Sequence, residues 1–245
     1  INSPPLARLE GWLAKAVQMA GFDSVIVADR QFDLMRYYHL AGIRRVVGWG
    51  DILDGGDPAW VEQEMQRLGT VREWLALEYH GVHVGRFAVA SAMRNLKLGQ
   101  LDLADPSVKQ LMRRLLEGSV RYTLAGLELL KVFRPDCILF LDRGYSGQGE
   151  LFDLALKNGI DAITWSDSFR SNLMLFKRYH TKNERDHHAS LGAESWRRML
   201  AMPWKAEYGE RVRAELFDAY ESQDWFSSYG VQFGKRMLSR EETLG

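Results

Sequence analysis

The chain has 245 residues, of which 46% are hydrophobic and 26% are charged, as in an ordinary globular protein with ample material for a core. Its 32 basic and 32 acidic residues balance to zero, so nucleic acid is not favoured as a partner. A single cysteine excludes a disulfide framework, and Cys137 lies in an apolar run, where we expect it to be buried. No apolar run reaches the roughly 18 residues that a membrane span needs.

The first fifty residues alternate between helix and strand patterns. Pro4 and Pro5 open a helix, and Gly21 ends it. The predicted apolar side of this helix consists of Leu6, Leu9, Leu13, Val17 and Ala20. In chain order, the predicted elements are a helix over 4–20, a strand over 24–29, a helix over 31–42, a strand over 43–49 and a turn over 50–58. This alternation predicts a parallel sheet with helices on its faces.

The middle of the chain has mostly helical patterns. A pattern with one apolar face starts at Asp105-Pro106 and stops at Arg134, because Pro135 cannot continue a helix. Before it we predict helices over 60–68 and 71–80 and, within 80–96, a loop leading into a helix. After it we predict a strand over 137–141, a helix over 150–159, a strand over 160–165, a strand or loop over 172–180, and helices over 192–201 and 205–221.

A polar, glycine-rich loop, LDRGYSGQGE over 141–150, follows the strand pattern CILFL. Ligands bind outside the carboxyl ends of the strands in open α/β sheets, so we expect a binding site here. The side chains expected at the ligand are those of Asp142, Arg143, Tyr145 and Gln148, while Gly144, Gly147 and Gly149 let the ligand approach the backbone. The spacing is neither a dinucleotide fingerprint nor a P-loop, and Glu150 opposes a phosphate, so sugar hydroxyls suit the loop better. A flexible loop that only caps a helix is the alternative.

Two further segments are expected to line the same crevice. Asp167 and Arg170 follow the strand over 160–165, and successive strands of a parallel sheet are often neighbours; Asp167 capping a turn is the alternative. In HGVHVGR, His80, His83 and Arg86 are candidate contacts, and either histidine can act as a base near neutral pH. No carboxylate or cysteine has a spacing that would complete a metal site with these histidines, so we expect no metal.

Two stretches, GVHVGRFAVASAMRNLKLGQLDLADPSV and FRPDCILFLDRGYSGQGELFDLALKNGIDAITW, resemble bacterial glycosyltransferases of capsule and surface-polysaccharide synthesis. That family often has a loop containing glycine and tyrosine after a Pro-Asp strand, followed by a helix. A further family pattern then follows, and the residues that match it are Gly159, Ile160, Ile163, Thr164 and Trp165. The tail WFSSYGVQFGKRMLSREE resembles the family's linker into a second domain. Where the family often has His-Gly in the loop, this chain has Arg143-Gly144, so the catalytic base stays open among His80, His83 and Asp142.

The resemblance implies one half of a GT-B architecture, in which two Rossmann-like domains face each other across a cleft. Residues 1–222 would form the N-terminal, acceptor-binding domain, an open parallel sheet with helices on both faces. Residues 223–245 would be a linker toward a missing donor-binding domain. A capping box at Ser239–Glu242 with only three residues after it agrees with a fragment, and a frayed tail is the alternative. The reaction would move a sugar from a nucleotide sugar to a glycan, with no metal or other cofactor in this domain. The nucleotide sugar would bind mainly to the missing domain, so we expect no turnover by this chain alone.

Two other classes of function stay open. One is a self-contained, non-catalytic Rossmann-like module that binds a carbohydrate or another small molecule, and the other is an unrelated small-molecule enzyme with the same loop. A lone cysteine fits a reducing compartment, so we expect the cytoplasm. The tail aromatics Trp225, Phe226 and Tyr229 leave open peripheral association with the inner face of the membrane, and packing between domains is the alternative. The sugar, the linkage and the oligomeric state are not readable from the sequence.

Overall fold

The computed structural model describes residues 4–28, 32–53, 55–168 and 173–222. The chain divides into two compact units, Ile1–Ala162 and Ile163–Gly245, and each is described by itself. The expected linker over 223–245 and the capping box at Ser239–Glu242 lie outside the described residues.

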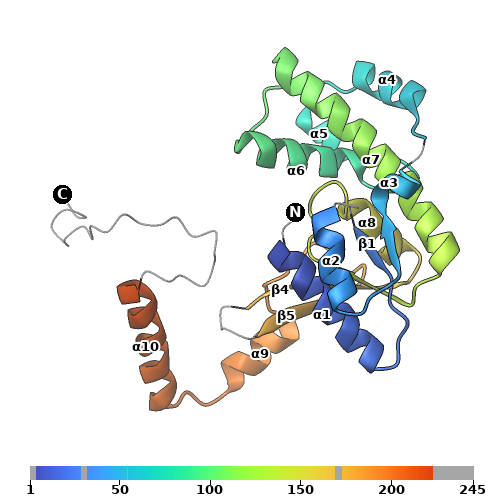
Figure 1. Cartoon of the computed structure of the whole chain (residues 1–245). Helices are drawn as coiled ribbons and strands as arrows, with labels where there is room; N and C mark the ends of the chain where they lie inside the picture. Colours follow the sequence, from blue (N-terminus) through green and yellow to red (C-terminus); the bar gives the residue numbers. More distant parts are fainter. Residues whose placement is uncertain (1–3, 29–31, 54, 169–172, 223–245) are drawn as a thin grey trace, which may run out of the picture. The chain divides into compact units, whose positions relative to one another are not determined.

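The N-terminal part of the first unit alternates between helix and strand, as its sequence predicts (Figure 1). Its elements are α1 (Pro4–Met19), β1 (Ile26–Ala28), α2 (Phe32–Leu40) and β2 (Val46–Gly48). β1 and β2 pair in parallel, with Val27 opposite Val47. The parallel pairing is therefore confirmed, although both strands are shorter than their apolar patterns.

Helix α1 packs against α2 through small residues. Ala7, Gly11 and Ala14 recur at helical spacing and are buried, whereas the leucines of the predicted apolar side are half-buried and Ala20 is exposed. Small side chains let the two helices approach closely: a Cβ on Gly11 would lie 3.1 Å from the Cβ of Ala41. The prediction therefore placed the buried face of this helix on the wrong side: the small residues are buried, and the predicted apolar residues lie beside them.

Helices form most of the remaining first unit. They are α3 (Trp49–Ile52), which takes the place of the start of the predicted turn, α4 (Pro58–Arg67), α5 (Val71–Leu75), α6 (Val84–Leu96) and α7 (Pro106–Phe133). The Asp105 carboxylate caps α7 by accepting a hydrogen bond from the Ser107 amide, and the helix ends at Arg134, as predicted. α6 lies beside α7 (Figure 1), and Phe87 and Met112 are buried in the core that these helices share.

The strand, loop and helix after α7 are β3 (Cys137–Phe140), residues 141–148 and α8 (Gly149–Lys157), followed by β4 (Asp161–Asp167). Burial increases along β3 from the exposed Cys137 to the buried Phe140. The prediction that Cys137 is buried is therefore wrong, because this residue begins the strand at the end that the core does not cover. The other end of β3, where the glycine-rich loop starts, is the buried one.

The second unit contains β5 (Met174–Tyr179), α9 (Ala193–Ala201) and α10 (Ala206–Ser222). The connection from β4 to β5, residues 168–173, is too short for a crossover between parallel strands, and the Ser168 amide donates a hydrogen bond to the Leu173 carbonyl. The two strands, which are neighbours in one sheet, therefore pair as an antiparallel hairpin, and the expected strand or loop over 172–180 contains a strand over Met174–Tyr179.

The fold class is mixed α/β, with about 56% helix and small sheets that include parallel pairing. One sheet has the order β1-β2 and the other the order β3-β4-β5. A Rossmann-like open sheet with helices on both faces is not confirmed, because the described strands fall into these two small sheets. In the described part of the chain, no helix has the length and apolar character needed to cross a membrane.

Candidate functional site

The loop over 141–148 is held in shape by its own polar groups. The Asp142 carboxylate accepts a hydrogen bond from the Gly144 amide at 2.8 Å, which makes a short Asx turn. The side-chain oxygen of Gln148 accepts one from the Asp142 amide at 3.0 Å, and the Gly149 amide donates to the Tyr145 carbonyl at 3.0 Å. The two ends of the loop are therefore tied together before any ligand is considered.

A buried carboxyl group ties the loop to the helices beneath it. Glu150, at the start of α8, is fully buried, and its two oxygens accept hydrogen bonds from the Ser119 hydroxyl of α7 and from the Gly147 amide. Burial raises the pKa of Glu150 from 4.5 to about 7, while the hydrogen bonds from Ser119 and from the backbone oppose this rise. A further anchor is the Ser146 amide, which donates to the Ser91 hydroxyl of α6 at 3.0 Å.

Two glycines of the loop serve its packing. Gly147 has φ +106°, a conformation that side chains rarely adopt, and it lies against the ring of Tyr122. Gly149 is buried, and a Cβ there would come within 2.3 Å of the Phe87 ring. The expectation that Gly149 exposes backbone to a ligand is therefore wrong, because an aromatic side chain of α6 fills that space.

A pocket of about 190 Å³ opens where β1, β2 and β3 end. Val27 and Ala28 come from the end of β1, Trp49 directly follows β2, and Leu141 and Asp142 directly follow β3. We call this the carboxylate pocket, and its polar and aromatic lining consists of Glu10, Tyr38, Trp49, Arg94, Tyr122, Asp142, Tyr145, Ser146 and Gln148. It lies at the carboxyl ends of strands, where α/β proteins bind small ligands.

Two carboxylates of the carboxylate pocket have different surroundings. The Glu10 carboxylate accepts a hydrogen bond from the Tyr38 hydroxyl at 2.6 Å. Burial raises the pKa of Glu10 above its ordinary value, and the Tyr38 hydrogen bond opposes that rise. Asp142 instead lies 3.7 Å from a guanidinium nitrogen of Arg94. The pocket thus combines one carboxylate in an apolar setting with one beside a cation.

Aromatic rings line the same pocket. The guanidinium of Arg94 lies over the Tyr145 ring, 4.4 Å from its centroid. Trp49 and Tyr122 meet edge to face, with their centroids 5.2 Å apart. Flat apolar faces next to carboxylate and amide groups suit a ligand that has both C–H faces and hydroxyl groups.

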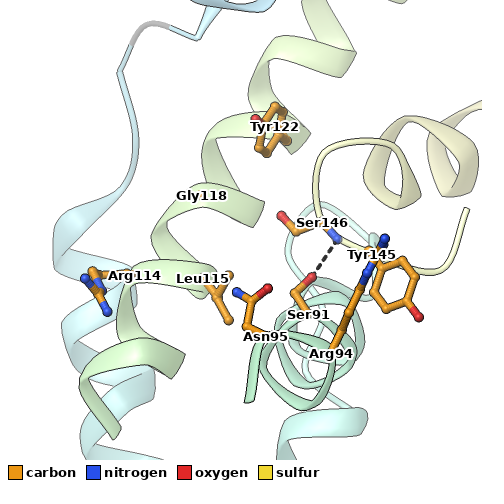
Figure 2. A pocket seen from close by; sticks show the side chains of 9 residues that line it. All are labelled: Ser91, Arg94, Asn95, Arg114, Leu115, Gly118, Tyr122, Tyr145 and Ser146. Carbon is orange, nitrogen blue, oxygen red and sulfur yellow. Dashed lines mark hydrogen bonds between the residues drawn. The ribbon is translucent and has the colours of Figure 1, made fainter. Parts of the chain in front are cut away.

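A second pocket, of about 300 Å³, lies between α6, α7 and the loop. We call it the arginine pocket, and its lining consists of Ser91, Arg94, Asn95, Arg114, Leu115, Gly118, Tyr122, Tyr145 and Ser146. Figure 2 shows Arg114 and Arg94 on opposite sides of it, with Ser91 and Asn95 between them. The two pockets share Arg94, Tyr122, Tyr145 and Ser146, so they adjoin each other.

Four loop residues that the sequence predicts at the ligand site line the carboxylate pocket: Asp142, Tyr145, Gly147 and Gln148. Gly144 borders neither pocket, and its amide is taken by Asp142. Arg143 also borders neither pocket; its guanidinium lies 5.3 Å from the centroid of the Phe152 ring. A role for Arg143 and Gly144 in acceptor binding stays a prediction that this geometry does not support.

The predicted residues of the segment 80–86 lie elsewhere. His83 Nδ1 is 2.8 Å from an Asp153 carboxylate oxygen, which also accepts a hydrogen bond from the His83 amide at 3.1 Å. Arg86 donates to the other Asp153 oxygen at 3.3 Å. His80 is exposed, has φ +48° and packs its ring against that of Tyr79. These contacts join the start of α6 to α8, and neither histidine borders the two pockets.

Asp167 and Arg170 cannot be assigned to the site. Asp167 ends β4, and its side chain is not described; Arg170 lies outside the described residues. The expectation that both face the crevice stays a prediction.

The sequence analysis missed most of the polar and aromatic residues that line the two pockets: Glu10, Tyr38, Trp49, Ser91, Arg94, Asn95, Arg114, Tyr122 and Ser146. One signal was available. Glu10 stands at helical spacing with Ala7 and Ala14, so it places a carboxylate on the small-residue face that α1 buries. A charged residue on a buried helix face needs a partner or a function.

In the described part of the chain, no three side chains of the types that bind metals come together as a metal-binding group. Comparisons with protein-family models, with curated proteins and with solved structures find no match to this chain.

Proposed function

We propose that this chain is the acceptor-binding domain of a glycosyltransferase and that the acceptor sugar binds in the carboxylate pocket. The observation that carries the proposal is the lining of this pocket at the ends of β1, β2 and β3. It brings the carboxylates of Glu10 and Asp142 and the amide of Gln148 next to the rings of Trp49 and Tyr145. Hydrogen-bonding groups of this kind match sugar hydroxyls, and the rings match the C–H faces of a pyranose.

The binding groups of the pocket remain available for a ligand. Gln148 uses its side-chain oxygen for the Asp142 amide, which leaves its NH₂ group to donate to a hydroxyl oxygen. Asp142 uses one oxygen for the Gly144 amide and turns the other toward Arg94 at 3.7 Å, which is too long for a strong ion pair. A sugar hydroxyl can therefore donate to this second oxygen.

Glu10 is the residue we propose as the base. In the reaction, a carboxylate takes the proton of an acceptor hydroxyl, the oxygen attacks the anomeric carbon of the donor sugar, and a nucleoside diphosphate leaves. The raised pKa of Glu10 makes its ionised form a stronger base than an ordinary carboxylate, and the Tyr38 hydroxyl holds it in position. Following the family resemblance, the nucleotide sugar would bind mainly to a second domain.

The proposal is tested by sugar binding to the chain itself. We would titrate ¹⁵N-labelled protein with neutral sugars, glucose, galactose, mannose, N-acetylglucosamine and cellobiose, and follow the amide resonances. Saturable shifts are expected at loop amides 142–148 and next to Trp49 for at least one of these sugars. Gln148→Ala should weaken this binding about tenfold, because it removes a hydrogen-bonding group.

The control is Gln110→Ala, which changes the same residue type on the exposed surface of α7. It should leave sugar affinity unchanged, and thermal melting of both variants checks that they are folded. Shifts that never saturate, or that map to residues distant from the carboxylate pocket, would contradict the proposed function.

A further inference from the structure

The arginine pocket differs from the carboxylate pocket in the charge of its lining. Among the residues that line it, the charged ones are Arg94 and Arg114, and none is a carboxylate. The neutral polar groups beside them are the Asn95 amide and the hydroxyls of Ser91, Tyr122, Tyr145 and Ser146. Its volume of about 300 Å³ is at the lower end of the roughly 300–1,000 Å³ of small-molecule sites.

The two arginines are not equally committed to protein partners. Arg94 stacks on Tyr145 and lies 3.7 Å from Asp142. Arg114 has no ion pair or hydrogen bond with any other described residue, although the neighbouring Arg113 pairs with Glu62 at 2.6 Å. Arg114 is exposed to solvent at the edge of this pocket, so its guanidinium is free to bind a ligand anion.

Two neutral residues of the pocket, Ser91 and Asn95, can also donate hydrogen bonds to a ligand. The Ser91 oxygen accepts a hydrogen bond from the Ser146 amide, so its own hydrogen remains available to donate. The Asn95 side chain points into the space between Ser91 and Leu115 in Figure 2. Donors and positive charges without a carboxylate are the complement of an oxyanion, and a guanidinium binds the oxygens of carboxylates and phosphates well.

We propose that the arginine pocket binds an oxyanion carried by the same ligand whose neutral sugar lies in the carboxylate pocket. The identification of the ligand as a glycan rests on the proposed function; the anion subsite itself rests on the lining of the second pocket. The pockets share four residues and therefore adjoin, so the ligand that we propose has two linked units, one in each pocket. The oxyanion is either the carboxylate of a uronic acid or a phosphate ester at the end of the glycan, and the shared feature is the negatively charged oxygen group.

The test uses three matched disaccharides: cellobiose, which is neutral; cellobiouronic acid, which carries a carboxylate; and cellobiose 1-phosphate. Affinities for the chain are measured by the same ¹⁵N titration at low salt. We expect at least one of the charged probes to bind about tenfold more tightly than cellobiose, and the preference to shrink as salt screens the charges. Whether the carboxylate or the phosphate probe binds more tightly identifies the source of the oxyanion.

Arg114→Gln should abolish the preference for the charged probes. The matched control is Lys109→Gln, which removes a positive charge from the exposed surface of the same helix and should keep the preference. Equal affinity for all three probes, or a preference that survives Arg114→Gln, overturns the anion subsite. Cellobiose binding at the loop in that case leaves the proposed function standing, whereas no binding of any probe overturns both.

Discussion

The buried carboxyl group beneath the loop makes the stability of this protein depend on pH. Glu150 is fully buried between α7 and the loop, and its pKa is about 7 in the folded protein against 4.5 for an ordinary glutamate. This difference corresponds to about 3 kcal/mol of unfolding free energy. Because the folded state binds the proton more tightly, this contribution is fully present below pH 4.5 and is lost as the pH rises to about 7.

The substitution Glu150→Gln isolates this contribution. Glutamine has the shape of the protonated side chain, so its oxygen can accept from the Gly147 amide and its NH₂ can donate to the Ser119 hydroxyl. We expect the variant to differ little from the wild type near pH 5 and to be the more stable protein at pH 8. The gain in unfolding free energy between these two pH values should be about 2.5 kcal/mol.

The measurement is urea unfolding of both proteins at half-unit steps between pH 5 and 8. A control, Glu128→Gln, removes an exposed carboxylate from α7 and should show no such trend with pH, because its side chain stays in solvent. The wild-type curve alone is not sufficient, since Glu10 also has a raised pKa and contributes with the same sign. The reasoning is refuted if the difference between Glu150→Gln and wild type stays constant over this range or changes in the opposite direction.

Three further predictions address the packing of the loop, the carboxylate of α1 and the histidine cluster. Gly149→Ala should cost about 1–3 kcal/mol in urea unfolding, because its methyl group would overlap an aromatic ring; Gly144→Ala has space and should cost far less. Tyr38→Phe should raise the pKa of Glu10 further, measured by ¹³C NMR of the carboxyl group, because it removes the opposing hydrogen bond; an unchanged or lower pKa would contradict that cause. His83→Ala should lower stability by about 1–3 kcal/mol yet leave sugar affinity unchanged, and weaker sugar binding would restore this histidine as a site residue.

Much of the local structure follows from short-range patterns. α7 begins after Asp105 and ends at Arg134, as predicted, because a capping carboxylate and a following proline act within a few residues. The parallel pairing of β1 and β2 follows from the alternation of helix and strand. The position of the loop beside a pocket follows from the rule that ligands bind at the carboxyl ends of strands.

What the sequence did not predict depends on contacts between distant segments. Glu10 and Tyr38 meet across 28 positions, and no local pattern connects them. Histidine is a residue type that often acts in catalysis, so the sequence made His83 a candidate. Its contact with Asp153, 70 positions later, instead holds the His83 side chain between two helices. Cys137 lies in an apolar run and is still exposed, because the end of a strand can extend beyond the core that covers its middle.

The polar groups of the loop over 141–150 fall into two sets. One set holds the loop in place: Glu150 binds Ser119 and the Gly147 amide, and the Asp142 and Gln148 oxygens bind loop amides. A loop that only capped α8 would need no more than this set. The second set comprises the NH₂ of Gln148, the second oxygen of Asp142 and the ring of Tyr145, and these border a pocket rather than the loop's own backbone. Polar groups on a pocket wall contribute little to folding when water can solvate them, so in our proposal the second set serves the bound sugar and the first set serves helix capping.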